Sequence, residues 1–313
     1  MTELINLSFT VSPAEAGQRI DKILVAHTAT LFTRSQLQLL IKDGHVLVNG
    51  QPAKPGWRMK SGETVTLTAP AYESAEQIIP IEIPLDVLYE DASIAVINKP
   101  AGMVVHPGAG DEQGTLAHAI LARYPEIGEM RYAPKRRGIV HRLDKETSGV
   151  ILIARTEASL HNLTAQFQMR TVEKQYIALL ERRPKTDRGR IDLPLARDPI
   201  NRKKMSVQRA GRPAVSEFFI EKVFDDGYTL VRINLFTGRT HQIRVHMAYI
   251  GSPIVGDRLY GLRRQRLGLN RQFLHASSLA FDHPNTGERM RFEAPLPDVL
   301  SAALSSLETS ASE

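Results

Sequence analysis

The chain has 313 residues, 42% of them hydrophobic, which is enough to bury the cores of about two domains. Its 40 Lys and Arg residues exceed its 34 Asp and Glu residues, and the net charge of +6 favours a polyanionic partner. The chain has no cysteine, which excludes disulfides, thiol nucleophiles and cysteine-bound zinc, and no apolar run approaches the ~18 residues that span a bilayer. We therefore expect a soluble, cytoplasmic protein.

The N-terminal part of the chain has the pattern of a small unit with two helices and short strands. Helices are predicted over 19–24 and 35–41 and strands over 46–48 and 64–67, with a hairpin turn at Asn49-Gly50. Four cations on and around the two helices suit contacts with phosphates: Arg19, Lys22, Arg34 and Lys42. A solvated helix surface explains the same charges.

The composition shifts between Ala69 and Pro84 to Pro, Glu, Ala and Ser, with few large apolar residues. The residues from Ser301 are again rich in Ser, Ala and Glu, and we expect them to be frayed. The expected parts are a first domain over 1–75, a linker over 76–87, a second domain over 88–305 and a flexible tail over 306–313.

The second domain mixes predicted strands with predicted helices. Strands are predicted over 94–97, 150–154, 173–179, 215–223 and 229–235, and a short strand with a glycine-rich loop over 104–110. Helices are predicted over 116–123 after a cap at Thr115, over 157–169, and between a cap at Thr240 and a stop at Gly251. Alternation along its strand points Tyr176 out of the apolar layer, toward a site, although a strand tyrosine usually only packs.

Two basic stretches, over 182–190 and 197–212, lie among prolines. Their irregular composition suits mobile arms that follow a phosphate backbone, although ordinary solvated loops have the same pattern. In the second stretch the cations expected to contact phosphates are Arg202, Lys203 and Lys204.

The run from His141 to Gly149 places Asp144 between two cations, Arg142 and Lys145, in a turn that feeds the buried strand over 150–154. Positive charge beside a carboxylate favours its ionised form, which suits a nucleophile or a fixed charge better than a general acid. A surface turn in which Asp144 pairs with Arg142 explains the same residues, so both interpretations stay open.

A second chemical stretch runs from Thr237 to Met247 and includes the start of a predicted helix. Arg239 would lie at that start, where its charge opposes the helix dipole and favours an anionic partner. His241 and His246 are five residues apart and so face different sides of a helix, and no third ligand is evident. We therefore expect no metal site.

Three motifs, in this order, resemble those of the RluA family of pseudouridine synthases: His141-Arg142-Leu143-Asp144 with Thr147-Ser148-Gly149, Lys174-Gln175-Tyr176, and Gly238 to His246. The resemblance runs from Leu88 to Pro297. Asn98-Lys99-Pro100 and Val105 to Gly110 further resemble the RluD branch, which modifies large-subunit ribosomal RNA. In front, Arg34-Ser35-Gln36 and Gly44 to Gly50 resemble the S4 RNA-binding domain.

The resemblance implies an α+β fold, in which a mostly antiparallel mixed sheet with helices follows a small S4-like α/β unit. It implies isomerisation of uridine to pseudouridine in 23S ribosomal RNA or a precursor of the large ribosomal subunit. The reaction needs no cofactor and no metal, since it exchanges a bond from ribose to nitrogen for one to carbon without redox change. We expect a monomer that contacts no membrane and binds RNA through the cations named above.

The resemblance also implies roles for single residues. Asp144 matches the catalytic aspartate, which attacks the base or the ribose or removes a ribose proton. Tyr176 matches the tyrosine that lies against the target base, and Arg244 resembles the basic partner of the aspartate, with Arg239 as second choice. Arg142 resembles the arginine that fills the place of the flipped nucleotide. The other expected substrate contacts are Ile243, which closes the pocket, His106 and Thr147.

Two other functions remain open at this stage. One is an RNA-binding factor of ribosome assembly that keeps the fold without catalysis, and the intact set of Asp144, Tyr176 and Arg244 argues against it. The other is a hydrolase of sugar–base bonds that uses two carboxylates, for which Glu146 is the only acid near Asp144 in sequence. The main hypothesis also has one alternative substrate: the chain could be a pseudouridine synthase that acts on other ribosomal or transfer RNA sites.

Overall fold

The computed structural model describes residues 4–28, 32, 34–54, 56–70, 78–108, 113–130, 137–262 and 267–309. The chain divides into two compact units, one within residues 1–77 and the other within residues 78–313, and each is described by itself. Among the described residues, no helix is long and apolar enough to cross a membrane.

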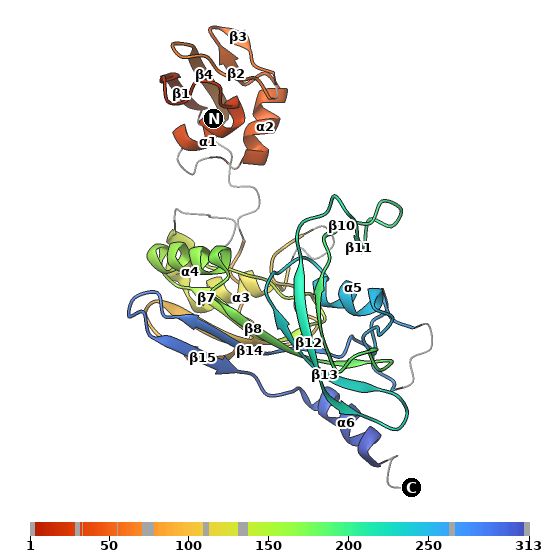
Figure 1. Cartoon of the computed structure of the whole chain (residues 1–313). Helices are drawn as coiled ribbons and strands as arrows, with labels where there is room; N and C mark the ends of the chain where they lie inside the picture. The colour runs from red at the N-terminus through yellow and green to blue at the C-terminus, as the bar shows by residue number, and fades with distance from the viewer. Residues whose placement is uncertain are drawn as a thin grey trace. The chain divides into compact units, whose positions relative to one another are not determined.

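The first unit packs two helices on a four-stranded antiparallel sheet (Figure 1). The strands run in the order β1 (Leu4–Thr10), β4 (Thr64–Pro70), β2 (Val46–Val48) and β3 (Gln51–Pro52), and the helices are α1 (Ile20–His27) and α2 (Arg34–Lys42). Apolar residues from both helices, including Leu24 and Leu37, share one buried core with Val46 and Leu67 from the sheet. Burying this apolar surface stabilises the unit.

The hairpin predicted at Asn49-Gly50 is confirmed. Val48 pairs with Gln51, and Asn49 and Gly50 have positive φ angles of 49° and 79°. Both angles suit the tight turn of a two-residue hairpin, for which Asn-Gly is the favoured sequence.

The second unit is built on one large mixed sheet. In the described part of the chain its strands follow the order β5 (Asp86–Glu90), β6 (Ile94–Lys99), β7 (Ser148–Ala154), β14 (Leu274–Asp282), β8 (Glu173–Leu180), β13 (Thr229–Leu235), β12 (Val215–Val223) and β9 (Arg188–Asp192), and β15 (Arg289–Glu293) also pairs with β14. The β7–β14 pair is parallel and the other described pairs are antiparallel. The α+β class and the mostly antiparallel mixed sheet are therefore as predicted.

Helices and one hairpin complete this unit. They are α3 (Leu116–Arg123), the 3₁₀ helix η1 (Pro125–Glu129), α4 (Glu157–Met169), α5 (Gln242–Tyr249), α6 (Asp298–Thr309) and the hairpin of β10 (Leu195–Arg197) with β11 (Met205–Val207). In Figure 1, α5 and the β10–β11 hairpin lie beside each other near β12 and β13. The bounds of α4 and of the β12–β13 pair agree with those predicted.

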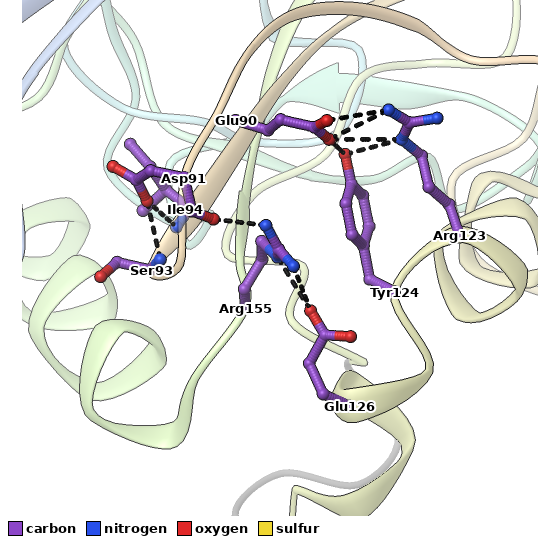
Figure 2. A network of polar contacts seen from close by, with 8 residues as sticks. All are labelled: Glu90, Asp91, Ser93, Ile94, Arg123, Tyr124, Glu126 and Arg155. Atoms are coloured by element: carbon purple, nitrogen blue, oxygen red, sulfur yellow. Dashed lines mark hydrogen bonds and ion pairs between the residues drawn. The ribbon is translucent and has the colours of Figure 1, made fainter.

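A polar network fastens α3 and η1 to the sheet (Figure 2). Glu90 at the end of β5 accepts a hydrogen bond from the Arg123 Nη2 at 2.9 Å and another from the Tyr124 hydroxyl. Arg155, directly after β7, pairs with Glu126 at 2.6 Å and lies over the Tyr124 ring, 4.6 Å from its centroid. These contacts hold the far end of β7, so the loop in front of β7 projects from a fixed strand.

The short strand predicted at the start of 104–110 is wrong. Residues 104–107 form no strand, because the carbonyls of Val104 and Val105 instead accept the N–H groups of Leu116 and Ala117 at the start of α3, at 2.8 and 3.1 Å. Ala109 and Gly110 lie outside the described residues.

The C-terminal stretch is also more ordered than expected. The chain from Ser301 to Thr309 belongs to α6, because Leu300, Ala303 and Leu307 recur at helical spacing and are buried. The two basic stretches contain strands as well, since the first leads into β9 and the second includes β11.

The start of β7 requires glycine. Gly149 has a φ of +117°, and a Cβ added there would lie 2.1 Å from the carbonyl oxygen of Ala276 on β14. This close approach is where β7 and β14 pair in parallel, as Ala276 is the partner of Gly149. The strand that follows the turn is therefore fixed against the centre of the sheet from its second residue.

We predict that Gly149→Ala lowers the free energy of unfolding by at least about 3 kcal/mol, because it adds a backbone clash to left-handed strain. Gly287→Ala is the control, since Gly287 also has a positive φ, of 73°, but has open space around its Cβ position. It should cost only about 1 kcal/mol. Denaturant unfolding of the full chain measures both, and equal losses would contradict the clash.

Candidate active site

A cavity of about 780 Å³ opens beside the loop that precedes β7. Its walls come from loop residues 139–144, from α4, from β8 and from residues 235–244. A cavity of this size, lined by apolar side chains with a few polar groups, is typical of a small-ligand site. All described lining residues belong to the second unit.

The wall of this cavity contains an ion pair between Asp144 and Arg244. The Arg244 Nη1 lies 3.2 Å from the Asp144 Oδ2, and the two side chains are 9% and 18% exposed. Asp144 comes from the loop before β7 and Arg244 from α5, 100 residues later. A charge-assisted hydrogen bond of this kind fixes the orientation of the carboxylate.

Arg244 is held from its other side by Asp257, which sequence reasoning missed. The Arg244 Nε donates to the Asp257 Oδ2 at 2.7 Å and the Nη2 to the Oδ1 at 2.9 Å. The Asp257 Oδ1 also accepts the backbone N–H groups of Leu259 and Tyr260. Only Nη1 therefore points to Asp144, and the bonds to Asp257 hold the Arg244 guanidinium in one orientation.

Burial and charge compete at this pair of residues. Burial raises the pKa of Asp257, but the hydrogen bonds and the charge of Arg244 outweigh it, and the net shift is downward. Burial lowers the pKa of Arg244, but its hydrogen bonds to Asp257 and the charges of both carboxylates raise it above the ordinary value. Both groups are therefore charged at neutral pH.

Tyr176 on β8 reaches the cavity as the alternation of its strand predicted. Its side chain lines the cavity and is 7% exposed. Burial raises its pKa, and the negative charge of Asp144 adds to the shift, so the hydroxyl keeps its proton. Lys174 lines the same cavity two residues earlier, and burial lowers its pKa to about 8.

His141 opens the loop and fastens it to β7. Its Nε2 accepts the backbone N–H of Leu152 at 2.9 Å, and its ring stacks on Phe167 with 4.8 Å between centroids. Burial and the charge of Lys174 lower the pKa of His141 to about 3, so it is neutral at pH 7. The histidine thus supports Asp144 by position rather than by charge.

The other expected substrate contacts lie around the same cavity. Arg142 is exposed at its edge, Ile243 is buried in its wall and His106 is half-buried there. Thr147 is buried, and its backbone N–H donates to the Asp144 carbonyl at 3.0 Å while its hydroxyl accepts from Gln272 at 3.2 Å. Thr147 therefore shapes the turn around Asp144.

The second choice for the pairing role is wrong. Arg239 lines the cavity, but its Nε donates to the Pro213 carbonyl at 3.1 Å, and among the described residues it forms no ion pair with Asp144. Burial lowers its pKa, and the nearby charges of Arg212 and Arg170 add to this.

The predicted cap of α5 is wrong too. The helix begins at Gln242 and its N-cap is His241, with a φ of +56°, rather than Thr240. The side chain of Gln242 bonds instead to the turn before the helix, where its Oε1 accepts the Arg239 N–H at 3.0 Å and the Thr237 hydroxyl at 2.7 Å. Gly251 follows the helix with a φ of +83°, as its predicted stop requires.

The two histidines of this segment serve other contacts. The His241 Nδ1 lies 2.9 Å from the Tyr260 hydroxyl, and His246 lies between Ser216 and the Leu193 carbonyl, at 3.0 and 3.1 Å. Within the described ranges, no group of three or more acidic or histidine side chains could hold a metal ion.

The residues expected to contact phosphates lie in both units. In the first, Lys22 and Lys42 are exposed and Arg19 pairs with Asp21 at 3.0 Å, while the side chain of Arg34 lies outside what the structure describes. In the second, three cations lie between β10 and β11, of which two are exposed and the third is half-buried: Arg202, Lys203 and Lys204.

The β10–β11 hairpin contacts the site at the start of β11, next to its loop. The Met205 N–H donates to the Tyr260 hydroxyl at 2.7 Å, and the Lys204 ammonium lies 5.7 Å from the centroid of the same ring. The Arg244 guanidinium also lies over that ring, at 5.2 Å. Tyr260 therefore links the basic hairpin to the arginine beside Asp144.

Comparisons with known proteins find the same enzyme family and the same N-terminal domain in this chain. The family described as RNA pseudouridylate synthase matches residues 93–249, and the S4 domain matches residues 18–65. The chain is 41% identical to the ribosomal large subunit pseudouridine synthase D of Vibrio parahaemolyticus, over 100% of this chain and 98% of that protein. It is 43% identical to the protein of the same name in Xanthomonas campestris, over 95% of this chain and 91% of that protein.

Two further similarities extend the comparison. An RNA pseudouridine synthase of Bacillus subtilis is 42% identical over 96% of this chain and 98% of its own length. The solved structure of the human RNA pseudouridylate synthase domain containing 4 superposes with a TM-score of 0.57 at 25% identity, covering 71% of this chain and 92% of that one.

We predict that Asp257→Asn lowers the free energy of unfolding at pH 7 by about 2 kcal/mol or more, because it breaks a buried pair. Since the folded pKa of Asp257 lies below its ordinary 3.8, this stability is present above that pH and is lost as the pH falls through the folded value. The difference between the two proteins should thus be constant near neutral pH and shrink below about pH 4.

Asp282→Asn is the matched control, because Asp282 pairs with Arg289 at an exposed site. It should change the free energy by less than about 1 kcal/mol. Unfolding curves measured from pH 7 to acid pH decide the matter, and equal losses in the two variants would mean that Asp257 does not hold Arg244.

Proposed function

Since the chain belongs to the RNA pseudouridylate synthase family, we propose that the uridines it isomerises lie in large-subunit ribosomal RNA and that Asp144 is its catalytic carboxylate. The relatives named for the large ribosomal subunit, at 41% and 43% identity over almost the whole chain, support this substrate. The observation that carries the proposed site is the Asp144–Arg244 ion pair in the wall of a cavity large enough for a nucleotide.

The reaction breaks the bond from ribose to a ring nitrogen and forms one to a ring carbon of the same base; the hydrogen on that carbon leaves as a proton, and the nitrogen takes up a proton. It changes no oxidation state, so it needs no redox cofactor. In the proposed mechanism Asp144 begins it by attacking the base, attacking the ribose or removing a ribose proton. Arg244 holds this carboxylate in its orientation through the hydrogen bond from its Nη1.

The target uridine has to leave the RNA stack before Asp144 can reach it. We assign its base to the first cavity, against the ring of Tyr176, whose buried and protonated phenol offers an apolar face. Arg142, exposed at the cavity edge, is placed to fill the gap that the flipped nucleotide leaves. Ile243 closes the inner wall.

Contacts with the RNA backbone extend over both units in this proposal. The S4 domain contributes Arg19, Lys22, Arg34 and Lys42, and the β10–β11 hairpin contributes Arg202, Lys203 and Lys204. Action as a monomer is part of the proposal. We keep 1–75 and 88–305 as the proposed domains, and the cytoplasm as the proposed compartment because the chain has no cysteine.

The test incubates the full-length enzyme with large-subunit ribosomal RNA and, separately, with transfer RNA, both transcribed without modifications. Release of tritium from the base carbon of labelled uridine measures turnover, and chemical mapping locates the products. We predict pseudouridine at few sites of the ribosomal RNA and at none of the transfer RNA. Modification of transfer RNA alone would overturn the proposed substrate.

The Asp144→Asn variant, in the same experiment, should release no tritium above background while its affinity for the RNA stays within about threefold of the unchanged enzyme, because only a charge at the reacting atoms is lost. Normal turnover in this variant would remove Asp144 from the mechanism. Free uracil among the products would instead indicate a hydrolase, and RNA binding without turnover in the unchanged enzyme would indicate an assembly factor.

A further inference from the structure

A second cavity of about 400 Å³ lies beside the same loop. It shares Asp144 and Arg244 with the first cavity, so the ion pair lies in the wall between the two. The proposed mechanism places the base in the first cavity and assigns nothing to the second. Its other lining includes four charged side chains that the mechanism does not use: Lys145, Glu146, Arg258 and Arg271.

Arg271 in this cavity is a buried cation that forms no direct ion pair in the described part of the chain. It is 8% exposed, and its Nη2 donates to the Ser148 hydroxyl at 2.9 Å and the Leu274 carbonyl at 3.1 Å. Its Nε approaches the Gln272 carbonyl at 3.4 Å. All these acceptors are neutral, whereas a buried guanidinium normally pairs with an anion.

A second buried cation lies close enough to Arg271 for their charges to interact. Lys99 is fully buried, and its Nζ donates to the carbonyls of Pro100, Met103 and Lys145 at 2.7, 2.9 and 3.2 Å. Burial, together with the charge of Arg271, lowers its pKa to about 7, although the charges of Glu146 and Asp144 act in the opposite direction. A buried guanidinium and a buried amine that is partly protonated at pH 7 thus lie near the Asp144 loop, both hydrogen-bonded to uncharged oxygens.

The nearby carboxylates act on this charge from a distance, but among the described residues they form no ion pair with Arg271 or Lys99. Asp144 already pairs with Arg244, and Glu146, although its charge acts on Arg271, forms no ion pair with it among the described residues. Toward solvent the cavity adds exposed Arg142 and Arg258, the latter 3.1 Å from the amide oxygen of Asn270. The cavity therefore combines a buried cation with exposed cations, which is a site for an anion.

We infer that the second cavity binds a phosphodiester group of the RNA next to the flipped uridine. This rests on the proposed function, because a uridine whose base fills the first cavity and whose ribose meets Asp144 brings its backbone to the shared wall. Guanidinium groups suit phosphate, since their planar fork donates two hydrogen bonds at once. Arg271 and Arg258 are the residues that hold this phosphate.

The first part of the experiment measures binding and needs no turnover. The probe is a fluorescein-labelled oligocytidylate with one central uridine, and anisotropy gives its Kd at several salt concentrations. Loss of one phosphate contact in Arg258→Gln or Arg271→Gln should lower the slope of log Kd against log salt by about 0.7. Arg271→Lys, which keeps the charge, should keep the slope of the unchanged enzyme. Arg291→Gln is the control and should also leave the slope unchanged, because Arg291 pairs with Glu293 on β15 and lines neither cavity.

The second part locates the phosphate. The same probe is made with one uncharged methylphosphonate, either 5′ or 3′ of the uridine. In the unchanged enzyme one of the two substitutions should weaken binding roughly tenfold, as loss of a charged hydrogen bond predicts. In Arg258→Gln that substitution should have no further effect, because the contact is already lost, while in Arg291→Gln it should weaken binding as in the unchanged enzyme.

Independent effects of the methylphosphonate and of Arg258→Gln would overturn the inference, as would an unchanged salt slope in that variant. Should Arg271→Gln fail to fold, Arg258→Gln still decides. A third outcome would also overturn the inference: inorganic phosphate stabilises the enzyme, Arg258→Gln abolishes this stabilisation, and the methylphosphonate has no effect on binding of the probe. The second cavity would then be a site for a small anion. None of these binding measurements depends on pseudouridine formation. Failure of the proposed function would appear in the tritium-release assay, and failure of this inference would appear in the binding data.

Discussion

The guanidinium of Arg244 lies between two carboxylates, and the arrangement of the site depends on this contact. Asp257 takes two of its nitrogen atoms at 2.7 and 2.9 Å, and the remaining one faces Asp144 at 3.2 Å. Because Asp257 is fully buried and also accepts two backbone N–H groups, the arginine cannot turn without losing several bonds. Asp144 thus meets a fixed positive charge while one side stays open to the cavity.

The large sheet gives this contact its rigidity. The turn that carries Asp144 is fastened at both ends, by His141 to the backbone of β7 and by Gly149 to the backbone of β14. β8, which pairs with β14, presents Tyr176 to the same cavity. Three stretches far apart in sequence therefore converge on one carboxylate because neighbouring strands bring them together, as expected for a site built on rigid elements.

Local patterns predicted most of the fold and part of the site. The bounds of α4 and the alternation that aims Tyr176 into the cavity follow from periodicity. The turn and the buried strand after Asp144 predict its position in the fold but leave its role open, and the resemblance to the RluA family is what singles it out. Asp257 and Arg271 carry no such local signal, since their meaning comes from partners 13 and 123 residues away. The cap of α5 was predicted wrongly for a different reason: threonine is only a common N-cap, and here the chain enters the helix one residue later, through His241 with a positive φ.

The most direct test of the account is the single-turnover rate of pseudouridine formation at saturating RNA in Arg244→Gln and Arg244→Lys. If a fixed positive charge keeps Asp144 ready to react, the glutamine variant should lose at least about a hundredfold in this rate while binding RNA almost normally, and lysine should recover part of the loss. A glutamine variant that reacts as fast as the unchanged enzyme would contradict the account.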